Sequence, residues 1–313
     1  MRRGPGLLIG LILLVPAGLF FCCSDSDDSF SEGFEVHEWG VLVGCYSDAE
    51  YYMTSRPEQA SLVREPVIYI HKEDKYPFSC RVTFGDGSPT LTYPEADTSG
   101  GQVFWDTVGF ADVSAFLTRG ADDFVPLEEI IDILNNVDAD ELDYHGTYSR
   151  FLFYEGAVAF ENEIEVMPYY SFDSLLVINH GDYTVHSLVL VKAMAGLAPI
   201  VAGMFRTVDS LAPDDSAVVR FPDVTEYVVP PWALELYELG FTPLEAGSFA
   251  DLWSNSFLAL ESEHELNMIY RLSRPQYDRI AAVDFNPDPE EFIRALYVVV
   301  HMTDSLLMGK PLP

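Results

Sequence analysis

The sequence predicts a mainly β protein, with immunoglobulin-like, sandwich-type sheets and a C-terminal α+β region. Short runs rich in β-branched and aromatic residues alternate with turn signals over residues 34–229. The spacing of apolar residues then changes from a period of two to one of about 3.6 near residue 230. The composition, 49% hydrophobic and 21% charged, is typical of a globular chain long enough for two domains.

The first 23 residues are predicted to be an export signal. The apolar run 7–21 follows two arginines and has the length of a signal-peptide core, whereas a membrane span usually needs about 20 apolar residues. A Cys-Cys pair and the polar stretch 24–33 then resemble the end of a bacterial lipoprotein signal and its tether, with Cys23 as the acylated residue. Ordinary cleavage after Ser24 is the alternative. We therefore expect an exported protein, either anchored to the membrane by lipid or free in the periplasm or outside the cell.

Residues 34–170 are expected to form a first sheet unit with a helical insert near 125–136. The insert places apolar residues on one helical face, and Pro126 suits its first turn. Strands are predicted on both sides of the insert, in runs 34–43, 66–72, 78–84, 90–94 and 148–166, with a turn at 85–89.

Residues 171–229 are expected to form a second sandwich-like unit, and 230–313 the α+β region. Helices are predicted from 232 to Gly240 and from Thr242 onward, where Thr242 and Glu245 form a capping box. The last segments of the chain are predicted as strands at 266–273 and 281–285 and a helix at 288–302.

The charge balance excludes one class of partner. The chain has 50 acidic and 17 basic residues, which gives a net charge of −33. Such a surface repels nucleic acid and anionic lipid headgroups, so no nucleic-acid partner is expected. The acidic stretch 136–146 begins like a calcium loop, but Leu142 and Asp143 occupy the positions of the third ligand and the glycine, so we reject an EF-hand.

A His-Glu-Trp triplet lies inside the strand predicted at 34–43. In a regular strand His37 and Trp39 share one face with valines, while Glu38 lies on the other face between Val36 and Leu42. A buried carboxylate needs a partner, because burying it alone costs several kcal/mol. We expect Arg64 or Arg81 to pair with Glu38, and a structural pair is favoured over a working site.

Further candidates for a functional site are few. The sequence has no HxH or HExxH spacing, so a zinc site would need ligands from three separate segments, such as His37, His71 and one more. It also has no nucleophile elbow and no glycine-rich phosphate loop. We therefore predict no metal and no cofactor. The candidate functional cluster consists of His37, Glu38, Trp39, His71 and Glu155.

Two cysteines, Cys45 and Cys80, lie beyond the signal. In an oxidising compartment they would pair and close a loop of about 35 residues. The alternative is that each is a small buried hydrophobic residue.

The chain resembles a group of uncharacterised bacterial exported proteins that share the HEWG motif, here residues 37–40, near the mature start. The resemblance continues through most of the mature chain, and the order of its motifs is its most specific feature. Directly after HEWG this chain has VLVG where the group has Thr-Phe-Thr. The group has no established activity, so the resemblance implies no catalytic residue. The shared motifs are REPVIYIH (64–71), GSPTLTYPEAD (87–97), FLFYEG (151–156), FADLWSNSFLALE (249–261) and IYRLSRPQYDRIAAVDFNPDPEEFIRAL (269–296).

These observations favour an envelope-tethered, β-rich protein that acts as a non-enzymatic binding or structural module. Its expected partners are the membrane, through the lipid anchor, and an envelope glycan or protein. The alternative is a hydrolase of glycan or peptide with an acidic residue, Glu38 or Glu155, in a cleft. The two are distinguished by whether these acids and the histidines meet on a concave surface. The sequence does not indicate an oligomeric state.

Overall fold

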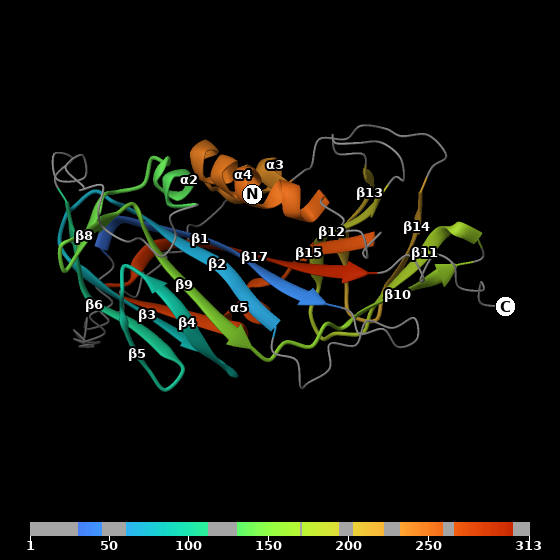
Figure 1. The fold of residues 1–313 in the computed structure, drawn as a ribbon, viewed down its shortest axis with the longest axis horizontal. Helices are drawn as coiled ribbons and strands as arrows, with labels where there is room; N and C mark the ends of the chain where they lie inside the picture. Colours follow the sequence, from blue (N-terminus) through green and yellow to red (C-terminus); the bar gives the residue numbers. More distant parts are fainter. Residues whose placement is uncertain are drawn as a thin grey trace, which may run out of the picture.

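The computed structural model describes residues 31–45, 61–111, 130–169, 171–193, 203–221, 232–258 and 266–302. The described part has three layers: a helical layer, a large central sheet and a layer of two smaller sheets (Figure 1). The expected signal peptide and Cys23 lie outside the described residues.

The central sheet has eight strands, and β1 lies in its interior. β1 pairs in parallel with β17 on one side and antiparallel with β2 on the other. In order across the sheet, the strands are β13 (Gly203–Leu211), β12 (Val185–Ala193), β15 (Leu266–Arg271), β17 (Pro289–Met302), β1 (Ser31–Cys45), β2 (Ser61–Lys72), β9 (Phe151–Val158) and β4 (Gly87–Tyr93).

Two smaller sheets pack against one face of the central sheet, and their apolar side chains share one buried cluster with it. One small sheet contains β16 (Ala281–Asn286), β3 (Phe78–Phe84), β6 (Gln102–Phe110), β7 (Leu142–Tyr144) and β8 (Thr147–Ser149), with β5 (Asp97–Ser99) paired to β6. The other contains β10 (Ile164–Tyr169), β11 (Ser171–Asn179) and β14 (Ser216–Arg220).

The opposite face of the central sheet is covered by helices. α2 (Ile131–Asn135), α3 (Trp232–Leu239) and α4 (Pro243–Leu258) contribute to a second buried cluster on this face (Figure 1). α5 (Arg274–Ile280) instead packs into the first cluster through Tyr277 and Ile280. Both faces of β1 are therefore buried, with Val36 and Leu42 in one cluster and Trp39 and Val41 in the other.

The predicted fold class is confirmed: the chain is mainly β, and helices and strands mix in its C-terminal region. The strands predicted from 34 to 94 are present, and β1 begins at Ser31, inside the stretch expected to be a tether. α3 and α4 lie where helices are predicted. Of the insert expected at 125–136, the described residues form the helix Ile131–Asn135, and the earlier part lies outside them.

The helix predicted at 288–302 is wrong, because this segment forms strand β17. Its side chains alternate between the two clusters, with Leu296 and Val298 on one face and Tyr297 and Val299 on the other. A strand buried on both faces is apolar throughout, so periodicity alone does not distinguish it from a buried helix. Pairing with β1 and β15 on its two sides satisfies the backbone of β17 and decides its conformation.

The central sheet draws strands from every region expected from the sequence. β12 and β13 come from 171–229, and β15 and β17 come from 230–313, yet all four join β1 in one sheet.

The predicted disulfide between Cys45 and Cys80 is not formed. Cys80 is a buried free cysteine on β3, close enough to Glu38 for that carboxylate to affect its pKa. Cys45 lies seven positions beyond Glu38 on β1, about 23 Å along an extended strand. Two cysteines with Cα atoms more than about 7 Å apart cannot be bridged without movement of the backbone. Cys80 therefore follows the alternative, a small buried residue.

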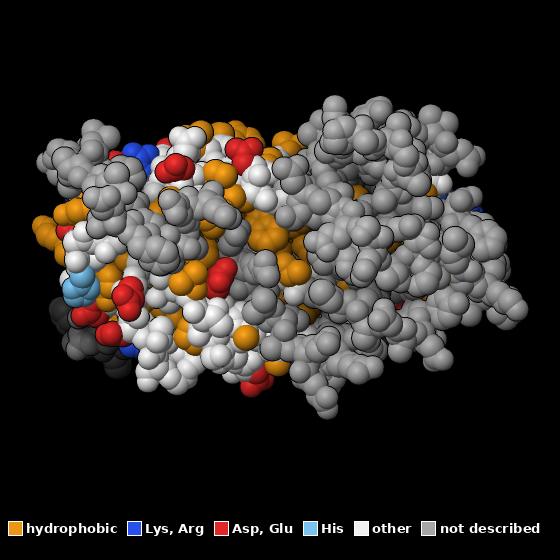
Figure 2. Space-filling view, in the orientation of Figure 1, with side chains coloured by type: hydrophobic (Ala, Val, Ile, Leu, Met, Phe, Trp, Pro, Cys, Tyr) orange, Lys and Arg blue, Asp and Glu red, His pale blue; other side chains and the backbone are white. Residues whose placement is uncertain are grey.

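The surface of the described part is rich in carboxylates. Figure 2 shows Asp and Glu side chains scattered over the described part of one face, with few Lys or Arg beside them. Among the described residues, no helix is both long and apolar enough to cross a membrane.

The position of β17 in the centre of the sheet leads to a test. Leu296 is fully buried and lies beside Gly40 of β1, whereas Leu234 on α3 is 60% exposed. We expect Leu296→Ala to cost about 2–5 kcal/mol of unfolding free energy, because it leaves a cavity between packed sheets. The matched control Leu234→Ala is expected to stay within about 0.5 kcal/mol. Urea unfolding of both variants measures the difference, and equal costs would contradict a central β17.

Candidate functional site

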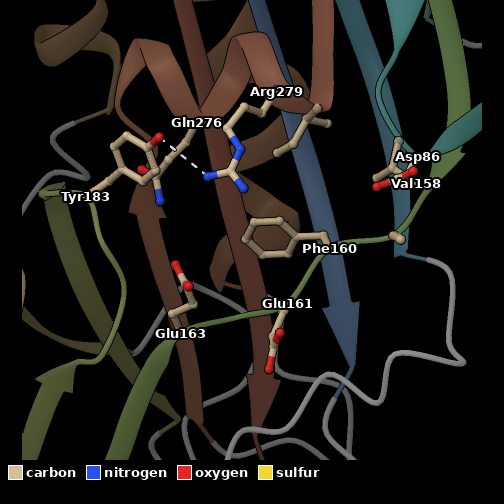
Figure 3. A pocket seen from close by; sticks show the side chains of 10 residues that line it. Asp86, Val158, Phe160, Glu161, Glu163, Tyr183, Gln276 and Arg279 are labelled. Carbon is tan, nitrogen blue, oxygen red and sulfur yellow. Dashed lines mark hydrogen bonds between the residues drawn. The ribbon is translucent and has the colours of Figure 1, made fainter.

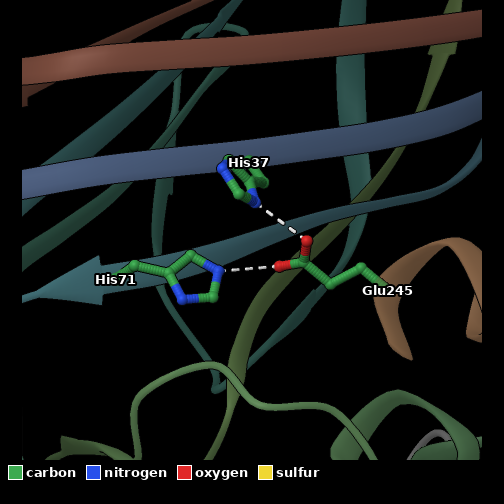
Figure 4. Close-up of side chains that lie close together, drawn as sticks. All are labelled: His37, His71 and Glu245. Carbon is green, nitrogen blue, oxygen red and sulfur yellow. Dashed lines mark hydrogen bonds and ion pairs between the residues drawn. The ribbon is translucent and has the colours of Figure 1, made fainter. Parts of the chain in front are cut away.

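Two histidines and a glutamate meet between the central sheet and the helical layer. The Nδ1 of His37 lies 2.8 Å from Oε2 of Glu245, and the Nε2 of His71 lies 2.8 Å from Oε1 of the same carboxylate. The two imidazole rings lie 4.7 Å apart, centre to centre. Figure 4 shows Glu245 reaching from its helix between the two rings, which project from neighbouring strands. We call this set the His-Glu-His cluster.

Strand register and a helix cap bring the cluster together. His37 on β1 lies opposite Tyr69 on β2, so His71, two positions along, projects from the same face of the sheet. Glu245 lies in the first turn of α4, where its Oε2 also accepts a hydrogen bond from the backbone N–H of Thr242 at 2.8 Å. The capping box predicted from the sequence is therefore formed, and its carboxylate also binds both histidines.

The cluster is more enclosed than a surface ion pair. The side chain of Glu245 has 0% exposure and that of His37 has 4%, while His71 is 22% exposed. Phe241 packs beside His37 with ring centres 5.5 Å apart. The only substantial opening of the three-residue set is thus at His71.

The charges in and around the cluster favour positive charge at His71. Burial alone would lower the pKa of His71, but the hydrogen bond and charge of Glu245, together with Asp138 and Asp140, raise it above its usual value. Burial likewise acts to raise the pKa of Glu245, and the hydrogen bonds from the two histidines outweigh it, lowering that pKa to about 2. Glu245 is therefore an anion at physiological pH, in a site where a cation is stabilised.

Further hydrogen bonds hold the carboxylate-bearing helix in place. The hydroxyl of Thr242 donates to Asp138 at 2.7 Å, and the hydroxyl of Ser248 donates to the carbonyl of Glu245 at 3.0 Å. Ser248 also lies 3.4 Å from the hydroxyl of Tyr69 on β2. These contacts fix the start of α4 against the sheet.

The donor set of the cluster matches that of a transition-metal site. Two imidazoles and one carboxylate, each from a different element, are ligands that zinc commonly takes. One ligand atom from each side chain lies within 4.8 Å of the other two. The sequence identified His37 and His71 and indicated that a third segment would be needed, but it marked Glu245 only as a helix cap.

Glu38 lies on the opposite face of β1 and does not join the His-Glu-His cluster. It is fully buried, and the hydroxyls of Tyr154 and Tyr277 donate to its Oε1 at 2.5 and 2.7 Å. The guanidinium of Arg294, its neighbour on β17, donates to its Oε2. Burial, and then the charge of Glu38, raises the pKa of both tyrosines well above the usual value, so they remain donors. Glu38 thus forms the structural ion pair that the sequence favoured.

The partner expected from the sequence is wrong. Arg81 is exposed and lies over the ring of Phe104, with its guanidinium carbon 4.9 Å from the ring centre. The side chain of Arg64 lies outside the described ones. Arg294 takes the role, because the parallel pairing of β1 and β17 places it beside Glu38 on the same face. Arg294 was not considered as a partner from the sequence, because it lies in the segment predicted to be a helix at 288–302.

Trp39 and Glu155 also lie apart from the cluster. Trp39 shares a face with His37 and packs edge-on against Phe249, with ring centres 5.2 Å apart, as a residue of the core. Glu155 lies on β9, four positions beyond Phe151, which is in register with Tyr69. That spacing separates Glu155 along the strand direction by about 13 Å from His37 and about 20 Å from His71. The five candidates therefore do not converge, and only His37 and His71 meet.

A separate pocket of about 270 Å³ lies near α5, and none of the candidates from the sequence lines it. Arg279 donates to the hydroxyl of Tyr183 at 3.4 Å (Figure 3), and Glu161 and Glu163 also line the pocket. Burial, and then Asp182 and Glu161, raises the pKa of Glu163. The charged groups of this pocket are exposed, so it lacks the enclosure of the His-Glu-His cluster.

The ion pair of Glu38 leads to the next prediction. Replacing Arg294 with methionine keeps the length of the side chain but leaves Glu38 buried without a counter-charge. We expect Arg294→Met to cost about 3–5 kcal/mol in urea unfolding, and the exposed control Arg81→Met less than about 1 kcal/mol. Adding Glu38→Leu to Arg294→Met should recover part of the loss. Equal costs for the two arginine variants would contradict the assignment.

The pKa shifts of the cluster predict a pH window. Glu245 has a lowered folded pKa, so its stabilisation is complete above its usual value of 4.5 and is lost as pH falls toward about 2. His71 has a raised folded pKa, so its stabilisation is complete below its usual value of 6.5 and is lost as pH rises through the folded value.

Measured in EDTA, the melting temperature of the native chain should therefore exceed that of Glu245→Gln most between about pH 4.5 and 6.5. Glutamine retains one oxygen for the capping hydrogen bond, so the comparison leaves the helix cap in place and removes the charge together with one acceptor at the histidines. A melting difference that stays constant from pH 4 to 9 would contradict a charged pair at this position.

Comparisons with known proteins add little to the geometry. No protein-family model matches the chain, and no curated protein matches it either. Distantly similar solved structures include the mu-homology domain of yeast delta-COP-I and the same domain complexed with a Dsl1 WxWxV peptide. They are 7% and 10% identical, with TM-scores of 0.35 and 0.34, and each match covers 87% of this chain and 97% of the other. Likeness at this level carries no inference about function, and the resemblance to the HEWG group stays a prediction.

Proposed function

We propose that this protein is exported, tethered to the cell envelope through Cys23, and acts there as a binding or structural module. The single observation that supports a module over a hydrolase is the state of Glu38. Both of its oxygens accept hydrogen bonds from buried groups, and the side chain has no exposure. A general acid must reach its substrate within hydrogen-bonding distance, and Glu38 has no path to one.

The other proposed acid gives no stronger support for hydrolysis. Glu155 lies away from both histidines, and glycoside hydrolysis needs two carboxyl groups placed about 5–10 Å apart across the bond that is cleaved. The polar group best suited to binding is the His-Glu-His cluster, which is preorganised by two strands and a helix cap. A preorganised polar site on a rigid sheet favours binding, because little order is lost when a ligand arrives.

The proposed location in the cell envelope is tested by fractionating bacterial cells that export the chain. The native chain is expected in the membrane fraction, since acyl chains attached near Cys23 hold it there. Cys23→Ser should release the protein into the soluble fraction, whereas the neighbouring control Cys22→Ser should remain bound. Retention of the Cys23→Ser protein would contradict the anchor.

The released Cys23→Ser protein then tests the role. We expect it to sediment again with isolated cell envelopes while releasing no soluble glycan or peptide fragments. Catalytic release of fragments that is lost in Glu155→Gln would instead support the hydrolase.

A further inference from the structure

We propose that His37, His71 and Glu245 bind one divalent transition-metal ion of the zinc class. The proposal rests on the proposed function only in treating the chain as a binding module, and it differs from the sequence-based expectation of no metal. Three observations carry it: the chemistry of the donors, their separation, and their enclosure.

The donors are of the right kind and number. Two imidazole nitrogens and one carboxylate oxygen are a recurrent set for zinc, with water or another small ligand in the remaining position. Magnesium and calcium prefer sites built from oxygens alone, so this set selects against both. Elsewhere on the described surface, His180 pairs with Glu165 at 2.6 Å, but this pair has no third ligand and its histidine side chain is 55% exposed.

The ligand atoms are close enough to converge on one metal ion. Zinc bonds of about 2.0–2.2 Å in tetrahedral geometry place neighbouring ligand atoms about 3.3 Å apart. The two N···O distances of 2.8 Å run to different oxygens of Glu245, and the three ligand atoms, one from each residue, lie within 4.8 Å of one another. Reaching the zinc spacing therefore needs shifts of up to about 1.5 Å. Such a shift lies within the reach of side-chain rotation, because the carboxylate ends a flexible side chain.

The enclosure and the outer contacts suit a metal centre. Glu245 and His37 are shielded from water, while His71 reaches the surface and provides an access route. The backbone N–H of Thr242 donates to the ligating carboxylate, which is the kind of outer contact that orients metal ligands. Asp138 and Asp140, whose charges act on His71, make the approach favourable for a cation.

The ion would join three segments that are distant in sequence. Residues 37 and 71 come from adjacent strands, and 245 comes from the first turn of α4. A bound ion would therefore fasten the helical layer to the central sheet, and binding energy would appear as added stability of that contact. The ion would stabilise this contact and keep one coordination position for water or an outside ligand.

The test is calorimetric titration of zinc chloride into the full-length chain after EDTA treatment and dialysis, at pH 7.5. The native chain should bind one zinc ion. The zinc affinity of Glu245→Gln and of His71→Asn should be lower by more than about 10- to 100-fold, which is the loss expected when only a hydrogen-bond partner of a metal ligand is removed. The matched control His180→Asn should bind as the native chain does. Near-ultraviolet circular dichroism establishes that each variant is folded. If Glu245→Gln does not fold, His71→Asn replaces it in the test, because His71 is partly exposed and its substitution disturbs the core less.

Cobalt gives an independent readout. Co²⁺ at this site should show visible bands of a nitrogen and oxygen environment, without the charge-transfer absorption of thiolates, which separates it from the N-terminal cysteines. Magnesium and calcium should not displace it, and the affinity should weaken at pH 5.5 because protons compete for the imidazoles. Equal zinc binding by the native chain and Glu245→Gln, or none by either, would overturn the proposal. The fractionation experiment is independent of metal, so its outcome and this one are separable.

Discussion

The buried pair of Glu38 and Arg294 is the interaction on which the arrangement of layers depends. Arg294 donates to Glu38 on the neighbouring strand, to Asp278 on α5 and to the carbonyl of Ala281 at the start of β16. One guanidinium thus joins the central sheet, α5 and the edge of a small sheet. Because both charges are desolvated, each requires the other, and the register of β1 against β17 is fixed by that requirement. A slip by one residue would turn Arg294 to the helical face and leave Glu38 unpaired.

The same strand carries the second polar centre on its other face. Alternation along β1 sends Glu38 toward the small sheets and His37 toward the helices. The first centre is closed and fully satisfied, which suits a structural role. The second has a partly exposed histidine and an anionic carboxylate held by a helix cap, which suits reversible binding of a cation. A single dipeptide therefore anchors both the core and the candidate site.

Local patterns in the sequence predict much of this arrangement. The strands from 34 to 94, the two faces of β1, the capping box at α4 and the structural pairing of Glu38 all follow from such patterns, since they depend on periods of two and 3.6 and on short-range caps. The predictions failed where burial removes the pattern. Residues 295–300 of β17 are apolar on both faces, so periodicity does not distinguish a strand from a helix there. The helix predicted at 288–302 included Arg294, which was therefore not identified as the partner of Glu38. The prediction of a disulfide between Cys45 and Cys80 was wrong, because their spacing in the sequence does not determine the distance between their Cα atoms in the folded chain.

For β1, β2 and α4 the sequence by itself determined which side chains share a face, because alternation and helical spacing are properties of the local backbone. It marked His37, Glu38 and His71 as polar groups in apolar runs, and it required a partner for Glu38 and a third ligand for any zinc site at the histidines. Only the tertiary structure decided which residues fill these roles. Arg294 is 256 residues from Glu38, and Glu245 is 208 from His37 and 174 from His71. Contacts at such separation are set by how the sheet assembles and where α4 docks, and no local propensity encodes either.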